Sequence, residues 1–115
     1  MTQVDMVREF MRMFGQETPS KQKLPDESTM ALRVRLTSEE NAEMATSITT
    51  AEYFDAVLDK LYVAFGDAVA AGFTAEEVRR GFGRVHNSNM SKLWTEDEVK
   101  CGIPCGATCV EINSL

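Results

Sequence analysis

Histidine and tryptophan occur once each in this 115-residue chain, as His86 and Trp94, and cysteine occurs three times. A single histidine excludes a zinc site built on several imidazoles, and no acylation-type nucleophile accompanies it, so we interpret His86 as structural. Cys101, Cys105 and Cys109 do not make a secreted disulfide framework. They also fall short of the four ligands of a structural zinc site, so we expect free thiols.

Basic residues are scarce as well. Twelve Lys and Arg against eighteen Asp and Glu give a net charge of -6. This balance argues against a nucleic-acid polymer or an anionic membrane surface as partner, because both require a basic patch. It leaves a nucleotide possible, since a metal ion can mask the phosphate charge. No apolar run approaches the roughly 20 residues that span a bilayer. The amphipathic start lacks the features of a signal peptide, so we expect a cytoplasmic protein.

Helical periodicity is the dominant pattern that the sequence does contain. It predicts one all-α domain with helices at about residues 4–15, 26–47, 49–72 and 74–86. Thr49 and Thr74 each precede a glutamate by three positions, the capping-box pattern of a helix start. Gly15 and Gly72 can end the first and third helices. We expect a domain over residues 1–92 and an irregular tail over residues 93–115, apart from a possible short strand at "ATCVEI".

The third predicted helix carries the widest apolar stripe. Its members are Phe54, Val57, Leu58, Leu61, Tyr62 and Phe65. Four helices give a core too thin to cover this stripe alone. We therefore expect a homo-oligomer, either a dimer or a dimer of dimers.

Five of the carboxylates on the second and third predicted helices form two groups. Glu39, Glu40 and Glu43 share one helix face by their spacing, as do Asp55 and Asp59. A short connection makes the two helices antiparallel, which brings the two sets opposite each other. Facing carboxylates repel unless a cation lies between them, and oxygen ligands favour Mg²⁺ or Mn²⁺. The residues alone leave a second reading open, in which these are solvated helix surfaces.

These carboxylates belong to an ordered set of motifs. The set comprises "FMRMFG", "LPDES", "LRVRL", "SEENAEM", "DAVLDKLYVAFG" and "VHNSNMSKLW". It resembles the all-α nucleoside triphosphate pyrophosphohydrolases of the MazG-like group, and most closely their small single-domain, phosphoribosyl-ATP pyrophosphohydrolase-like members. The E-E-x-x-E motif alone is weak, whereas the ordered set over residues 10–92 is specific.

The resemblance implies a reaction and a cofactor. Family members cleave a nucleotide between its α and β phosphates, which gives a nucleoside monophosphate and pyrophosphate. Glu40, Glu43 and Asp59 would then ligate Mg²⁺, for which Mn²⁺ can substitute. Glu39 would be the catalytic group that orients the attacking water, or would ligate an additional metal ion. The family usually has E-x-x-D on the third helix, and its glutamate falls on Ala56 here.

The resemblance leaves the fourth metal ligand open and suggests where substrate binds. Asp55 is the substitute ligand that we prefer, and Glu52 is the alternative. Lys92 and Asn89 would contact the phosphates. Tyr62 and Phe14 are candidates for the base pocket, and Trp94 for a subunit contact or lid. Arg33 and Arg35 can pair with carboxylates or contact phosphate, and of these we expect ion pairs on the surface.

The substrate itself is not read by any residue pattern. Some phage members of the group hydrolyse dGTP or dATP, so we expect a purine deoxynucleotide, in the host cytoplasm if the protein is phage-encoded. The alternatives are phosphoribosyl-ATP, a pyrimidine deoxynucleotide, or a non-catalytic helical module whose acidic face binds a basic partner.

Overall fold

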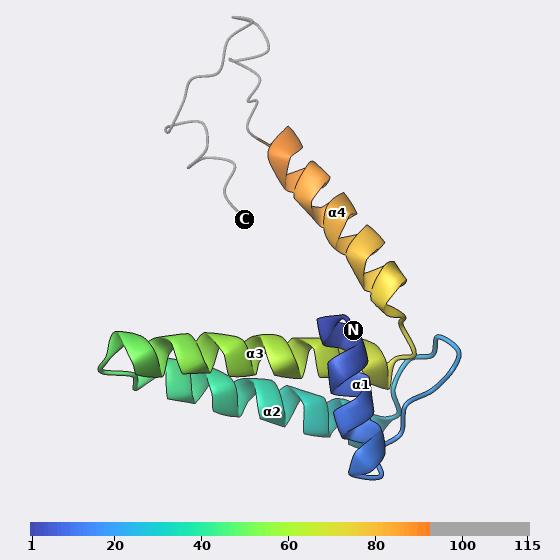
Figure 1. Ribbon diagram of the computed structural model, residues 1–115, viewed down its shortest axis with the longest axis horizontal. Coiled ribbons are helices and arrows are strands. Elements are labelled where there is room, and N and C mark those ends of the chain that lie inside the picture. The colour runs from blue at the N-terminus through green and yellow to red at the C-terminus, as the bar shows by residue number, and fades with distance from the viewer. Residues whose placement is uncertain (93–115) are drawn as a thin grey trace, which may run out of the picture. The chain divides into compact units, whose positions relative to one another are not determined.

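The computed structural model describes residues 1–92, which fold into helices and connecting loops without a strand in that range. The helices are α1 (Gln3–Met13), α2 (Glu27–Ala45), α3 (Thr50–Ala70) and α4 (Ala75–Ser91), drawn in Figure 1. The predicted all-α class is confirmed. The predicted end of the last helix near His86 is wrong, because α4 continues for five more residues. This segment has lost apolar spacing but contains neither glycine nor proline, so nothing in it breaks a helix.

Four residues predicted to start or end helices have the backbone geometry expected of them. Thr49 and Thr74 accept hydrogen bonds from the backbone N–H groups of the glutamates three positions later, at 3.1 Å each. Gly15 and Gly72 have φ angles of 73° and 81°, in the left-handed region that glycine tolerates. A Cβ at Gly72 would also overlap the carbonyl oxygen of Lys21, where the loop before α2 passes the end of α3.

The chain divides into two compact units, Met1–Val78 and Arg79–Leu115. In the first unit α2 and α3 run antiparallel and α1 packs across α3 (Figure 1). Its core consists of Val4, Val7, Met11, Val69 and Ala70, with Phe65, Ala75 and Val78 packed against them. In the second unit the described residues are the remainder of α4 and Lys92. The predicted boundary at residue 92 stays a prediction.

The apolar stripe of α3 is buried on one side only. Val57 and Phe65 are partly buried, whereas Phe54, Leu58 and Leu61 are 58%, 45% and 47% exposed. This matches the expectation that a core this thin leaves part of the stripe uncovered, and the homo-oligomer stays a prediction. Within residues 1–92 no helix combines the length and hydropathy needed to cross a membrane.

Four features predicted from the sequence lie outside the described residues. They are Trp94, the three cysteines, the possible strand at residues 107–112 and the irregular tail.

Candidate metal centre

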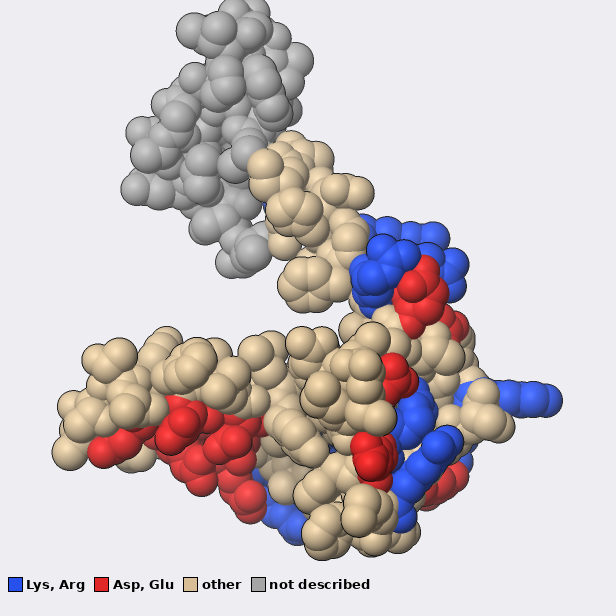
Figure 2. All heavy atoms as spheres, in the orientation of Figure 1, with Lys and Arg blue, Asp and Glu red and all other residues tan. Residues whose placement is uncertain are grey.

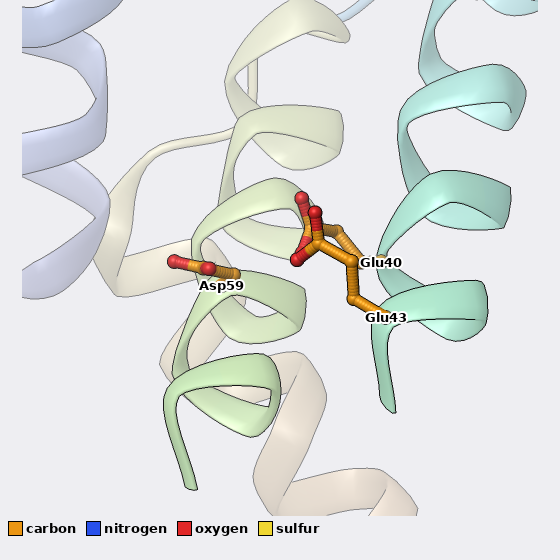
Figure 3. A group of neighbouring side chains, drawn as sticks. All are labelled: Glu40, Glu43 and Asp59. Carbon is orange, nitrogen blue, oxygen red and sulfur yellow. The ribbon is translucent and has the colours of Figure 1, made fainter. Parts of the chain in front are cut away.

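Three of the predicted carboxylates come together where α2 and α3 face each other. Glu40 and Glu43 project from α2 toward α3, which carries Asp59 (Figure 3). One carboxylate oxygen from each residue lies within 4.8 Å of the others. Figure 2 shows acidic side chains gathered along this part of the first unit. We call Glu40, Glu43 and Asp59 the carboxylate cluster.

Glu40 is the most enclosed member of the cluster. It is partly buried, while Glu43 and Asp59 are exposed. Its Oε2 atom is buried without a hydrogen-bond partner in the part of the chain that the structure describes. Desolvation, followed by the negative charge of Glu43, raises the pKa of Glu40 above its ordinary value of 4.5. A divalent cation would supply the missing partner and cancel the repulsion.

The donor set fits a small hard cation. Mg²⁺ holds oxygen ligands at about 2.1 Å, so ligands on opposite sides of the ion lie about 4.2 Å apart. The three oxygens of the cluster lie within 4.8 Å of one another, and adjacent ligands of an octahedral ion lie about 3.0 Å apart, so the oxygens must move closer together to hold one ion. Rotation of the exposed Glu43 and Asp59 side chains provides that adjustment. Oxygen donors alone favour Mg²⁺ or Mn²⁺ over zinc.

The other predicted carboxylates lie outside the cluster. Glu39 is exposed, with its Oε1 atom 4.0 Å from Nε of Arg35. Asp55 is exposed on α3 and is not a member of the cluster. The side chain of Glu52 instead accepts the backbone N–H of Ile48 at 3.1 Å, as part of the α3 cap. The catalytic role of Glu39 and the ligand role of Asp55 stay predictions.

The predicted aromatic residues, Phe14 and Tyr62, both contact the ring of Phe10. The Phe10 ring lies 4.6 Å from that of Phe14 and 5.6 Å from that of Tyr62, the latter edge to face. Phe10 and Phe14 are four apart on a helix, a spacing that could have indicated their contact. Tyr62 and Phe14 are 41% and 69% exposed.

The two predicted phosphate contacts, Asn89 and Lys92, belong to the second unit. Asn89 lies in the last turn of α4, and its carbonyl oxygen accepts the backbone N–H of Lys92 at 3.1 Å. Asn89 therefore sits inside a helix, beyond the predicted helix end at His86. The role of both side chains in phosphate binding stays a prediction.

Arg33 and Arg35 differ from each other, although the sequence predicted surface pairing for both. Arg35 is exposed, as expected. For Arg33 the prediction is wrong, because the residue is only 8% exposed. Its Nε atom donates to Oδ1 of Asp67 at 2.7 Å, and its Nη2 atom donates to the carbonyl oxygen of Val63 at 2.7 Å. Because Asp67 on α3 pairs with it, the charged Arg33 side chain is buried at the interface of α2 and α3.

Comparison with known proteins places the site in a family. A comparison with curated proteins finds no match, and a comparison with solved structures finds none. The family model described as phosphoribosyl-ATP pyrophosphohydrolase matches residues 7–89, which include the whole carboxylate cluster. The chain therefore belongs to the phosphoribosyl-ATP pyrophosphohydrolase family, within the MazG-like all-α pyrophosphohydrolases that its motifs resemble.

Proposed function

We propose that the protein is a cytosolic, Mg²⁺-dependent pyrophosphohydrolase that cleaves a purine nucleoside triphosphate between its α and β phosphates. The observation that carries the proposal is the carboxylate cluster, with its buried and unpaired Glu40 oxygen, in a member of a pyrophosphohydrolase family. Within such a family, three carboxylates near one another are better explained by a cation than by solvation.

The proposed roles follow from the position of each side chain. Glu40, Glu43 and Asp59 hold the metal ion, which when bound neutralises the polyphosphate and activates water. Glu39 is adjacent to Glu40 and exposed, so it can accept a hydrogen bond from a water molecule entering from solvent. The water oxygen bonds to the phosphorus on one side of the α–β anhydride, and the bond from that phosphorus to the bridging oxygen breaks. The bridging oxygen leaves with the other phosphate, and the protons of water pass to the products and buffer. The products are a nucleoside monophosphate and pyrophosphate.

The aromatic cluster of Phe10, Phe14 and Tyr62 supports a nucleotide rather than inorganic polyphosphate as substrate. Tyr62 follows Asp59 by three positions, so both side chains lie on one side of α3. A half-exposed aromatic ring can stack on a base. A purine offers the larger stacking surface, and both a purine deoxynucleotide and phosphoribosyl-ATP carry a purine with a triphosphate.

The test is a substrate panel. Purified protein is incubated with each of the eight canonical nucleoside and deoxynucleoside triphosphates and with phosphoribosyl-ATP, with Mg²⁺, Mn²⁺ or EDTA. Products are then separated by chromatography. We expect monophosphate and pyrophosphate from a purine substrate, and no turnover in EDTA. Release of single phosphate groups, or turnover unaffected by EDTA, would contradict the proposal.

Substitution of a residue of the carboxylate cluster tests whether the reaction takes place there. Glu43→Gln keeps the shape of the side chain but removes its charge, so we expect turnover to fall by about 10²-fold or more. Glu27→Gln is the matched control, because Glu27 is an exposed glutamate in the first turn of the same helix. Equal activity of the two variants would place the chemistry elsewhere.

A further inference from the structure

A buried arginine joins α2 to α3 on the same interface as the carboxylate cluster. The Arg33 side chain is 10% exposed, while that of its partner Asp67 is 44% exposed. The guanidinium also donates to the carbonyl oxygen of Val63, one helical turn before Asp67. Because the guanidinium donors are planar and rigidly spaced, two bonds to one helix fix both the position and the direction of the group.

Gly66 provides the space that this contact needs. A Cβ at Gly66 would overlap Nη2 of Arg33 and would lie 3.0 Å from its Cζ. A glycine inside a helix is unfavourable relative to alanine. The chain nevertheless has one at the point where the guanidinium lies against the α3 backbone. We call Arg33, Val63, Gly66 and Asp67 the arginine clamp.

The same number of residues separates the arginine clamp from the carboxylate cluster on α2 and on α3. Glu40 follows Arg33 by seven residues on α2, and Asp59 precedes Gly66 by seven residues on α3. Seven residues make about two turns, or about 10.5 Å along the axis, and return to nearly the same face. Because the helices are antiparallel, both steps lead in the same direction.

The carboxylate cluster therefore lies between two fixed points of the helix pair. On one side is the short connection from α2 to α3 at residues 46–49, and on the other is the clamp. Mutual repulsion of three carboxylates tends to part the helices between these points. A slip of α2 along α3 by one turn, about 5.4 Å, would exceed the 4.8 Å within which the three oxygens now lie.

We propose that Arg33 is a positioning residue for the metal centre. By holding α2 against α3 it sets the register in which Glu40 and Glu43 meet Asp59. The inference rests on the proposed function, since it assigns Arg33 to the assembly of that same site. It adds that a residue two turns away, which contacts neither metal nor substrate, determines how well the site binds a cation.

The test is a titration with Mn²⁺ in the absence of nucleotide, followed by electron paramagnetic resonance of the ion. We expect Arg33→Met to weaken Mn²⁺ binding by about tenfold, the scale seen when the supports of a metal site are removed. Val7→Ala is the control for lost stability, because it truncates a buried core residue of α1 that lies outside both the clamp and the cluster. Val7→Ala should bind Mn²⁺ as the wild type does.

A second pair of variants keeps the test decisive if Arg33→Met fails to fold. Gly66→Ala should displace the guanidinium and weaken Mn²⁺ binding as Arg33→Met does. Gly81→Ala is its match, because Gly81 is also inside a helix but has open space around its Cβ position. The double variant Arg33→Met/Gly66→Ala should bind no more weakly than Arg33→Met alone, since both changes act on one contact.

The outcomes separate this inference from the proposed function. Wild-type Mn²⁺ affinity in folded Arg33→Met, or in Gly66→Ala if the former is unfolded, overturns the positioning role alone. A wild-type protein that neither binds Mn²⁺ nor shows turnover sensitive to EDTA overturns both proposals. Weakening in Val7→Ala equal to that in Arg33→Met would also overturn the positioning role, because general stability would then explain it.

Discussion

Two regions of the α2–α3 interface differ in how their charges are balanced. At the arginine clamp, one cation meets the Asp67 carboxylate and a backbone carbonyl group, and it is buried. At the carboxylate cluster three acidic groups meet, and within residues 1–92 none of the three forms an ion pair with Lys or Arg. Among residues 1–92, the charge of the first region is balanced by a partner, whereas that of the second is not.

The difference separates a structural ion pair from a ligand site. A charge that has its partner within the fold can be buried, and it then fixes how two helices pack. Carboxylates without such a partner stay near the surface, where solvent or a cation can reach them. The carboxylate cluster, which no Lys or Arg of the described residues balances, is therefore the better candidate for function, although the buried arginine is the more unusual residue.

Ala56→Glu should have the largest effect on stability, because it adds a fourth acidic group to the region that already lacks a cation. Ala56 is 3% exposed and precedes Asp59 by one helical turn. Burying an unpaired charge should lower the free energy of unfolding in EDTA by about 3 kcal/mol or more. Excess Mn²⁺ should return much of this loss by binding the folded state. Urea denaturation with and without the ion measures both effects.

Ala56→Gln separates charge from size in that experiment. Gln has nearly the volume of Glu, so it carries the same cost of overpacking without the added charge. We expect Mn²⁺ to stabilise the Glu variant by more than the Gln variant. Equal stabilisation of the two would show that a side chain at position 56 does not reach the cation.

The facing of Glu40 and Glu43 toward Asp55 and Asp59 was predictable from the residues because its geometry is local, whereas the choice of Asp59 as a ligand followed from the family resemblance. Helical spacing places Glu40 and Glu43 on one face, and a short connection then returns the chain antiparallel so that Asp59 lies opposite. Asp55 satisfies the same spacing rule relative to Asp59, yet it lies outside the cluster. Spacing along one helix does not determine how that helix is rotated toward its neighbour.

The arginine clamp was not predictable in the same way. The burial of Arg33 depends on Asp67, which is 34 residues away, and on the missing Cβ of Gly66. An arginine four residues before a glutamate normally pairs along the helix surface, which is what Arg35 and Glu39 do. The length of α4 was missed for another reason: the segment after His86 lacks apolar spacing, but a helix exposed to solvent does not require it.

Glu40→Gln should make the stability contributed by the carboxylate cluster less dependent on pH. The folded state raises the pKa of Glu40, so between its ordinary value of 4.5 and the raised value the folded protein holds more protons than the unfolded one. In EDTA, the stability due to this group is therefore lost as the pH rises through that window. Above it, Glu40→Gln should be more stable than the wild type, as thermal denaturation can measure.

Other carboxylates act in the opposite direction, so the comparison must be between the two proteins at each pH. Hydrogen bonds from Thr2 and Thr29 lower the pKa values of Asp5 and Asp26, whose contribution to stability is lost as the pH falls below 3.8. These groups are unchanged in Glu40→Gln and cancel in the difference. A difference that does not grow between acidic and neutral pH would contradict the account of Glu40.

Arg35→Gln should have the smallest effect, although Arg35 is only two residues from the clamp. Its Nε atom lies 4.0 Å from Glu39, and both side chains are more than half exposed. Exposed ion pairs of this kind contribute less than about 0.5 kcal/mol, because solvent screens them and both side chains lose freedom when they pair. The free energy of unfolding in urea should therefore stay within about 0.5 kcal/mol of the wild type.

Arg33→Met, measured in parallel, should lose several times more free energy of unfolding, because it leaves Asp67 and the Val63 carbonyl group without their donor. Equal losses from the two arginines would mean that burial of the guanidinium contributes nothing to the pairing of α2 with α3, and the contrast between the arginine clamp and the carboxylate cluster would fail.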